Sequence, residues 1–308
     1  MDLKTYARLR AKIPGLEAER RLAWALLLLV WVGGLGLGGS LGVMLVKLGA
    51  PPLYPLLALA GGGAAALWLS PAVLYPYKRR FKRELVKPLL EGQFENVAYA
   101  PLGSVSPLEV EASLLFESFP PEAFSGEDLV TGQVRGVSVK LSEVRIRPWV
   151  RERERFFGKR YELEPGVFAG LFFVADFHKP APGVVVAYPE RWLFRKPPVD
   201  LIPVRMEDPR FERHFRVYAS DRLFAFYALS PTLLETLAHF AEETGPLAFA
   251  IAYGKLYLAV PGGDRLEPPL FGSLKSPALY QGFLDEVERF LALVEALRLN
   301  RKLWGTIE

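Results

Sequence analysis

Two long runs of apolar residues near the start of the chain dominate its pattern. The runs cover residues 22–46 and 53–75 and contain no charged side chain. They are separated by the segment 47–52, which holds Lys47 and the pair Pro51-Pro52. A helix needs roughly 20 residues to cross the hydrocarbon core of a bilayer, and each run is that long. The pattern therefore predicts a transmembrane helical hairpin, which we expect the mature protein to retain.

Beyond the second run the periodicity changes from helical to extended. Residues 84–91 predict a short extension of the second helix, ending near Pro88 and Gly92. Alternating apolar and polar residues then predict an antiparallel hairpin over 129–134 and 137–146. The nearly continuous apolar run 167–177 is typical of a central strand that is covered on both faces.

Further runs complete the predicted secondary structure. Short apolar runs at 110–116 and 183–188 predict strands. Residues 211–219 and 223–229 predict a hairpin that turns at Ser220-Asp221-Arg222. Residues 247–253 and 256–260 predict strands joined by a tight turn. Helices are predicted at 231–243, after Ser230 and Pro231, and at 277–299, which carries an apolar stripe.

These elements predict an α+β chain rather than a doubly wound parallel sheet. The expected architecture is an N-terminal two-helix transmembrane hairpin, then a mostly antiparallel β-rich domain with a C-terminal amphipathic helix. The predicted parts are a basic N-terminal segment (1–21), the hairpin (22–76), a basic juxtamembrane helix (77–92) and an α+β domain (93–308).

The distribution of charged residues predicts how the hairpin is oriented in the membrane. The chain has 38 Lys and Arg against 34 Asp and Glu, and the basic residues gather on both flanks of the hairpin, with Lys47 alone between the runs. The positive-inside rule predicts a multi-pass protein of the inner membrane with both termini and the soluble domain in the cytoplasm. The basic cluster after the second run serves as an orientation signal and is a candidate for contact with lipid headgroups; it consists of Lys78, Arg79, Arg80, Lys82 and Arg83.

Small residues recur at four-residue spacing in both apolar runs and predict close helix packing. They are Gly34, Gly38 and Gly42 in the first run and Ala58, Gly62 and Ala66 in the second. Packing between the two helices is the preferred interpretation; in the alternative, one stripe mediates oligomerisation. The segment 34–39 also satisfies the dinucleotide-binding pattern G-x-G-x-x-G, but that motif needs a preceding strand and an accessible helix start. We therefore reject it.

Little in the chain identifies a reaction. There is no cysteine, which excludes disulfides and thiol catalysis, and the three histidines lack metal-ligand spacing. We expect no cofactor and no metal. The best enzymatic cluster combines Asp176 and His178, two apart on one strand face, with Glu143 and Asp221 if their strands adjoin. Polar residues at strand ends usually face solvent, so a structural role is favoured for these four.

A second charged region, residues 145–164, mixes basic and acidic side chains around several aromatic residues. The intervening glutamates would repel phosphates, so a hairpin tip is favoured over a nucleic-acid groove. The candidates for contact with another protein are its aromatic residues Trp149 and 156–157, together with the segment 192–194 that begins at Trp192.

Several blocks of the downstream sequence form a recognisable combination: 124–129 (FSGEDL), 132–137 (GQVRGV), 141–144 (LSEV), 167–186, 208–221, 229–231 and 249–260. Together they resemble the bacterial family catalogued as domain of unknown function 3137. The resemblance covers roughly residues 77–300, and it implies two membrane helices ahead of the shared domain. It implies no activity.

The favoured hypothesis is a membrane-anchored cytoplasmic interaction or adaptor module without a catalytic role. Its expected partners are the lipid bilayer and a protein, or a second copy bound through the hairpin; nucleic acid is not expected. Two alternatives stay open. One is a membrane-proximal enzyme that uses the Asp176/His178 neighbourhood, and the other is an accessory subunit of a membrane transport complex.

Overall fold

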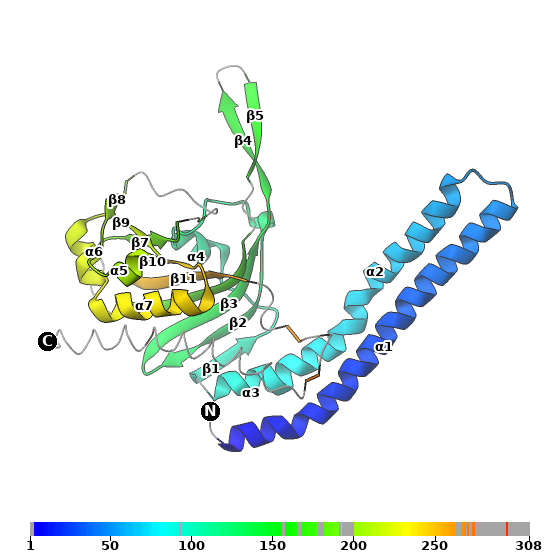
Figure 1. Ribbon diagram of the computed structural model, residues 1–308, viewed down its shortest axis with the longest axis horizontal. Coiled ribbons are helices and arrows are strands. Elements are labelled where there is room, and N and C mark those ends of the chain that lie inside the picture. Colours follow the sequence, from blue (N-terminus) through cyan, green and yellow to red (C-terminus); the bar gives the residue numbers. More distant parts are fainter. Residues whose placement is uncertain are drawn as a thin grey trace. The chain divides into compact units, whose positions relative to one another are not determined.

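The computed structural model describes residues 3–92, 94–155, 158–164, 168–177, 182–190, 192, 200–262, 267–268, 270, 273–274 and 294, with backbone alone at 3–10, 151–155 and 158–164. The chain forms two compact units (Figure 1). The anchor unit comprises Met1–Gly92 and Leu266–Gln281. The sheet unit comprises Gln93–Arg265 and Gly282–Glu308. The chain therefore passes from one unit to the other three times.

The anchor unit is built on two long antiparallel helices that lie side by side (Figure 1). They are α1 (Leu3–Lys47) and α2 (Leu53–Phe81); a π-helical turn (Lys82–Val86) and α3 (Lys87–Glu91) extend α2. Both helices contain a stretch long and apolar enough to cross a membrane. The predicted extension of the second helix is present and ends at Gly92, and Pro88 lies within α3 instead of ending it.

The two helices approach most closely at their small residues. A Cβ on Gly34 would lie 2.5 Å from the Gly62 carbonyl oxygen and 3.1 Å from the Ala66 Cβ. A Cβ on Gly38 would lie 2.6 Å from the Ala58 carbonyl oxygen, and one on Gly42 would lie 3.2 Å from that of Pro55. The backbones are therefore closer here than any larger side chain would allow.

The sheet unit contains a nine-stranded sheet in which each paired strand is antiparallel to its neighbour. The strand order is β1-β2-β3-β6-β11-β10-β7-β9-β8. The strands are β1 (Glu95–Ala100), β2 (Phe124–Val134), β3 (Val137–Ile146), β6 (Phe168–Asp176), β7 (Val185–Tyr188), β8 (Ile202–Val204), β9 (Arg216–Ala219), β10 (Ala248–Ala252) and β11 (Lys255–Pro261). A separate two-stranded ribbon holds β4 (Trp149–Arg155) and β5 (Gly158–Glu164) (Figure 1).

Short turns connect the two predicted hairpins. Arg135 and Gly136 both have positive φ, at 50° and 78°, as do Tyr253 and Gly254, at 53° and 71°. Two such residues in succession form the turn that matches the twist of antiparallel strands. The sequence predictions for these hairpins, for the buried central strand β6 and for the α+β class are confirmed.

Helices pack on both faces of the sheet. One face carries α4 (Pro107–Ala112) and a core that includes Phe116, Phe168 and Phe172. On the other face the ring of Phe249 packs against aromatic rings around α5 (Pro209–Glu212), which in turn contacts α7 (Pro231–Thr244). The α7 helix begins at Ser230, whose hydroxyl accepts the Leu233 amide, and ends at Gly245, as predicted.

Two predicted elements are wrong. The apolar run 110–116 covers the last residues of the short helix α4, which Ser106 caps, and the turn that follows the helix. The predicted hairpin over 211–229 is instead α5, β9 and α6 (Arg222–Ala228), because Asp221 caps α6 by accepting the Phe224 amide at 2.8 Å. The predicted helix 277–299 lies outside the described residues except for Val294, which is helical and buried.

Candidate functional site

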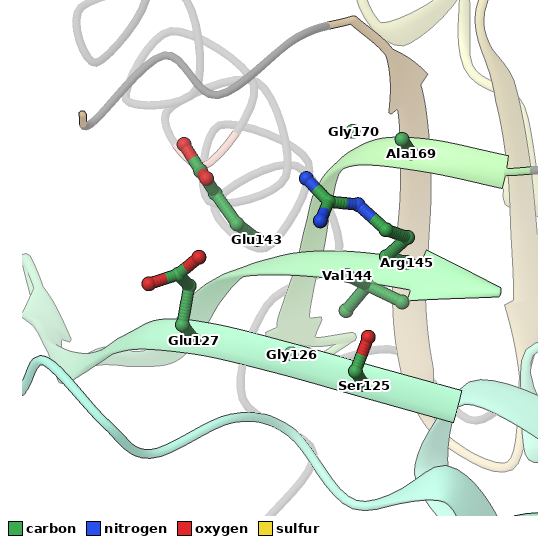
Figure 2. Close-up of a pocket in the computed structure, with 8 residues that line it drawn as sticks. All are labelled: Ser125, Gly126, Glu127, Glu143, Val144, Arg145, Ala169 and Gly170. Carbon is green, nitrogen blue, oxygen red and sulfur yellow. The ribbon is translucent and has the colours of Figure 1, made fainter. Parts of the chain in front are cut away.

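A pocket of about 240 Å³ lies on the face of the sheet formed by β2, β3 and β6 (Figure 2). Glu127 pairs directly with Glu143 across β2 and β3, and Ser125 pairs with Arg145 in the same way. Figure 2 shows the two carboxylates and the guanidinium on one side of the strands. Paired carboxylates suit a hard cation or an amine, and the arginine beside them partly neutralises their charge. Glu143 is only 6% exposed.

Two glycines support the pocket from the strands beneath it. A Cβ on Gly126 would lie 2.6 Å from the Ser104 Cβ, and one on Gly170 would lie 2.1 Å from the Val260 carbonyl oxygen. Neither position has room for a side chain, so the strands are packed tightly below the polar face. The shape of the pocket therefore depends on residues that carry no functional group.

The register separates the candidate catalytic residues predicted from sequence. Glu143 pairs with Leu171, whereas Asp176 lies five residues further along β6 and pairs with Lys255. An odd separation on one strand places the two carboxylates on opposite faces of the sheet. Asp221 serves as the N-cap of α6, and His178 lies outside the described residues. A catalytic role for these four residues stays an untested hypothesis.

Sequence reasoning missed an ion cluster on the face that carries α4. Glu109 accepts hydrogen bonds from the Nζ atoms of Lys140, at 2.9 and 3.0 Å, and of Lys255, at 2.9 Å. Burial opposes ionisation of Glu109, but the two lysines outweigh it and lower the pKa of the carboxyl. Burial, with a smaller effect of Glu109, raises the pKa of Tyr257 to about 12. The cluster connects α4 to β3 and β11, which are far apart in the sequence. The spacing of residues along the chain therefore could not predict it.

Two of the aromatic residues proposed for protein contact are structural. The Trp192 indole N–H donates to the Leu115 carbonyl at 3.0 Å, and its ring packs near Phe168. Trp149 packs edge-on against Phe119. The side chains of 156–157 and 193–194 lie outside the described residues. Both tryptophans are half-buried against the core of the sheet unit, and their contact with another protein stays an untested hypothesis.

A protein-family model described as "Protein of unknown function (DUF3137)" matches residues 166–299. The match supports membership of the DUF3137 family. It confirms the resemblance for the blocks from residue 167 onwards, whereas the blocks 124–129, 132–137 and 141–144 precede the matched residues. The DUF3137 match takes in Ala169 and Gly170 of the pocket, whereas Glu127, Glu143 and Arg145 precede it.

Comparison with other proteins adds one structure. The protein in the crystal structure of the mycobacterial trehalose monomycolate transport factor A, TtfA, is 14% identical in sequence to this chain. The alignment covers 71% of this chain and 97% of that chain, with a TM-score of 0.37. A TM-score this low does not establish a shared fold. No curated protein matches the chain.

Proposed function

We propose that this protein is a membrane-anchored interaction module, with α1 and α2 crossing the inner membrane and the sheet unit in the cytoplasm. The observation that carries the proposal is the surface of the two helices. Large apolar side chains point outward along both, among them Leu37 at 75% exposed and Trp68 at 80%. The core helix of a soluble protein would bury such residues, and lipid is the solvent that suits them.

The flanking charges support the cytoplasmic orientation. Basic residues precede the first apolar run and follow the second, whereas the segment 47–52 between them contains Lys47 alone. Moving the clusters across the bilayer would be costly, so they stay on the side of synthesis. The short loop around Gly49 is then the part that reaches the periplasmic side.

An exposed apolar surface on the sheet unit supports the interaction role. Leu223 and Phe226 on α6 are 78% and 41% exposed, and Ile202 on the neighbouring strand β8 is 47% exposed. Phe226 also lines a cavity of about 420 Å³ together with Leu229 and Leu234. Exposed apolar side chains next to a cavity are typical of a surface that binds another protein. We refer to Ile202, Leu223 and Phe226 as the α6 patch.

The orientation can be measured with single cysteines, because the natural chain has none. Ala50→Cys in the loop should react with a membrane-impermeant maleimide in intact cells. Glu117→Cys in the sheet unit should react only after the cells are permeabilised. Labelling of Glu117→Cys in intact cells would contradict the orientation, and release of the protein from membranes by carbonate would contradict the anchoring.

The α6 patch can be tested by photo-cross-linking in cells. A benzoylphenylalanine at position 223 should form a protein adduct of defined mass, and Phe226→Glu should reduce that adduct at least fivefold by placing a charge in the patch. Position 102 is the matched control, because Leu102 is also exposed but lies in the loop after β1. Equal adducts at 102 and 223, or none at 223, would contradict a specific surface.

A further inference from the structure

The basic cluster at the end of α2 is divided between two environments within the anchor unit. Lys82 is buried and pairs with Glu267, its Nζ 2.8 Å from the carboxylate, and Lys78 pairs with the same glutamate. Arg80 pairs with Glu19 on α1 and Glu84 on its own side of the hairpin. These three basic residues are therefore engaged with carboxylates of the same chain.

A segment far along the chain supplies one side of this network. The guanidinium of Arg20 donates to the Leu270 carbonyl at 2.8 Å, and the Leu274 amide donates to Glu17 at 3.1 Å. Leu274 and Leu16 are each 1% exposed. The described residues within 267–274, which we call the strap, are thus held to the end of the helix pair by ion pairs and by hydrogen bonds between side chains and the backbone.

Two carboxylates of this network, those of Glu17 and Glu267, are ionised at neutral pH. Hydrogen bonding from Arg20 outweighs burial and lowers the pKa of Glu17 to about 2 from its ordinary 4.5. Burial of Glu267 opposes ionisation, but Lys78 and Lys82 outweigh it and lower the pKa of its carboxyl. Because both values are lowered on folding, the stabilisation that Glu17 provides is present above about pH 4.5 and is lost as the pH falls towards 2.

The remaining basic residues of the region form a separate stripe. Arg79 and Arg83 are exposed and four residues apart, and the exposed Lys87 follows after another four. The π-helical turn between them uses more residues per turn than an α-helix, so four-residue steps stay close to one line. The ion pairs of Arg83 with Glu84 and of Lys87 with Glu91 are long, at 3.7 Å each.

We propose that the two sides of this basic cluster bind different partners. Lys78 and Lys82 hold the strap of the same chain, and the stripe Arg79–Arg83–Lys87 contacts anionic lipid headgroups. The proposal rests on the membrane anchoring proposed above. It assigns a site to residues 267–274 and restricts headgroup contact to the stripe, whereas the sequence alone treats all five basic residues as equivalent.

The strap half is tested by the accessibility of Leu274→Cys in the full chain, purified in a neutral detergent. The thiol should be protected from maleimide, and Lys82→Gln or Glu267→Gln should each raise its labelling rate at least tenfold. Arg83→Gln is the matched control and should leave the rate within twofold. Because Lys78 also pairs with Glu267, the exchange Lys82→Glu with Glu267→Lys is made together with Lys78→Gln. This combination should restore protection, which separates loss of the ion pair from general damage.

The lipid half is tested with the same proteins. Dansyl-labelled phosphatidylglycerol should bind more tightly than dansyl-labelled phosphatidylcholine, and Arg79→Gln with Arg83→Gln should reduce that preference at least tenfold, given about fivefold for each basic residue near anionic lipid. Lys82→Gln should change the preference less than twofold. Raising the salt concentration should weaken the wild-type preference.

The outcomes distinguish this inference from the anchoring itself. An equal loss of lipid preference in Lys82→Gln and in the double variant Arg79→Gln with Arg83→Gln would overturn the division. Protection of Leu274→Cys that survives Glu267→Gln would also overturn it. Each of these results leaves the anchoring intact if the loop at Ala50 is still labelled from outside. Loss of that labelling in the wild-type chain would overturn both proposals.

Discussion

Gly62→Leu should separate the two apolar helices, while Gly61→Leu should leave them packed. A Cβ at position 62 would lie 2.1 Å from the Gly34 carbonyl oxygen, which is backbone and cannot rotate away. Nothing lies within 4 Å of a Cβ at position 61. The two variants add the same apolar side chain one residue apart, so a difference between them reports the contact rather than hydrophobicity. The expected cost at position 62 is about 3 kcal/mol or more, at the upper end for overpacking.

Disulfide formation measures this separation directly. The pair Leu35→Cys and Gly63→Cys reports on this contact, because a Cβ on Gly63 would lie 3.7 Å from the Leu35 Cδ2 across the helix pair. Oxidation should cross-link this pair in the wild-type background and with Gly61→Leu, and at least tenfold less with Gly62→Leu. Equal cross-linking in all three would show that the helices do not meet at Gly62.

Gly170→Ala should destabilise the sheet unit strongly. The new Cβ would lie 2.1 Å from the Val260 carbonyl oxygen and 2.9 Å from the Pro261 Cα, so β6 and β11 would have to move apart in the middle of the sheet. We expect a loss of about 3 kcal/mol or more, equivalent to a fall of about 10 °C in the unfolding midpoint.

The neighbouring residue supplies the control for Gly170. Ala169→Val adds two methyl groups on the same strand, but there the side chain faces the pocket rather than β11. Thermal unfolding of the purified full chain, followed by near-ultraviolet circular dichroism, should show a midpoint within about 3 °C of wild type for Ala169→Val. A similar midpoint for both variants would mean that the sheet relaxes around position 170.

The sequence predicts those parts of the fold whose determinants are local. The apolar runs, the hairpin turns at Arg135-Gly136 and Tyr253-Gly254, and the Ser230 cap of α7 each depend on residues within a few positions. The error at 211–229 has the same origin. The local pattern places Asp221 in a turn, although an Asp followed by a short apolar run also fits an N-cap. Local pattern alone leaves those two possibilities equal.

The candidate site could not be predicted in the same way. The pairing of Glu127 with Glu143 follows from the register of β2 and β3, which includes an irregularity between Glu127 and Val130. The cluster around Glu109 joins residues 31 and 146 positions apart. The strap joins Glu17 to Leu274, 257 positions away. Contacts between residues so far apart in the sequence are set by tertiary packing, so composition and residue spacing do not predict them.

The route of the chain between the two units has a consequence for how the protein can be taken apart. Because residues 266–281 belong with the apolar helices and residues 282–308 with the sheet, the peptide bond after Gly92 is only one of three connections. A protease that cuts there leaves the sheet unit tethered through both ends of the strap. A fragment beginning at residue 93 would in turn carry Leu274 without the surface that covers it. The anchor unit is thus defined by the contacts among its residues, and no single position in the sequence separates it from the sheet unit.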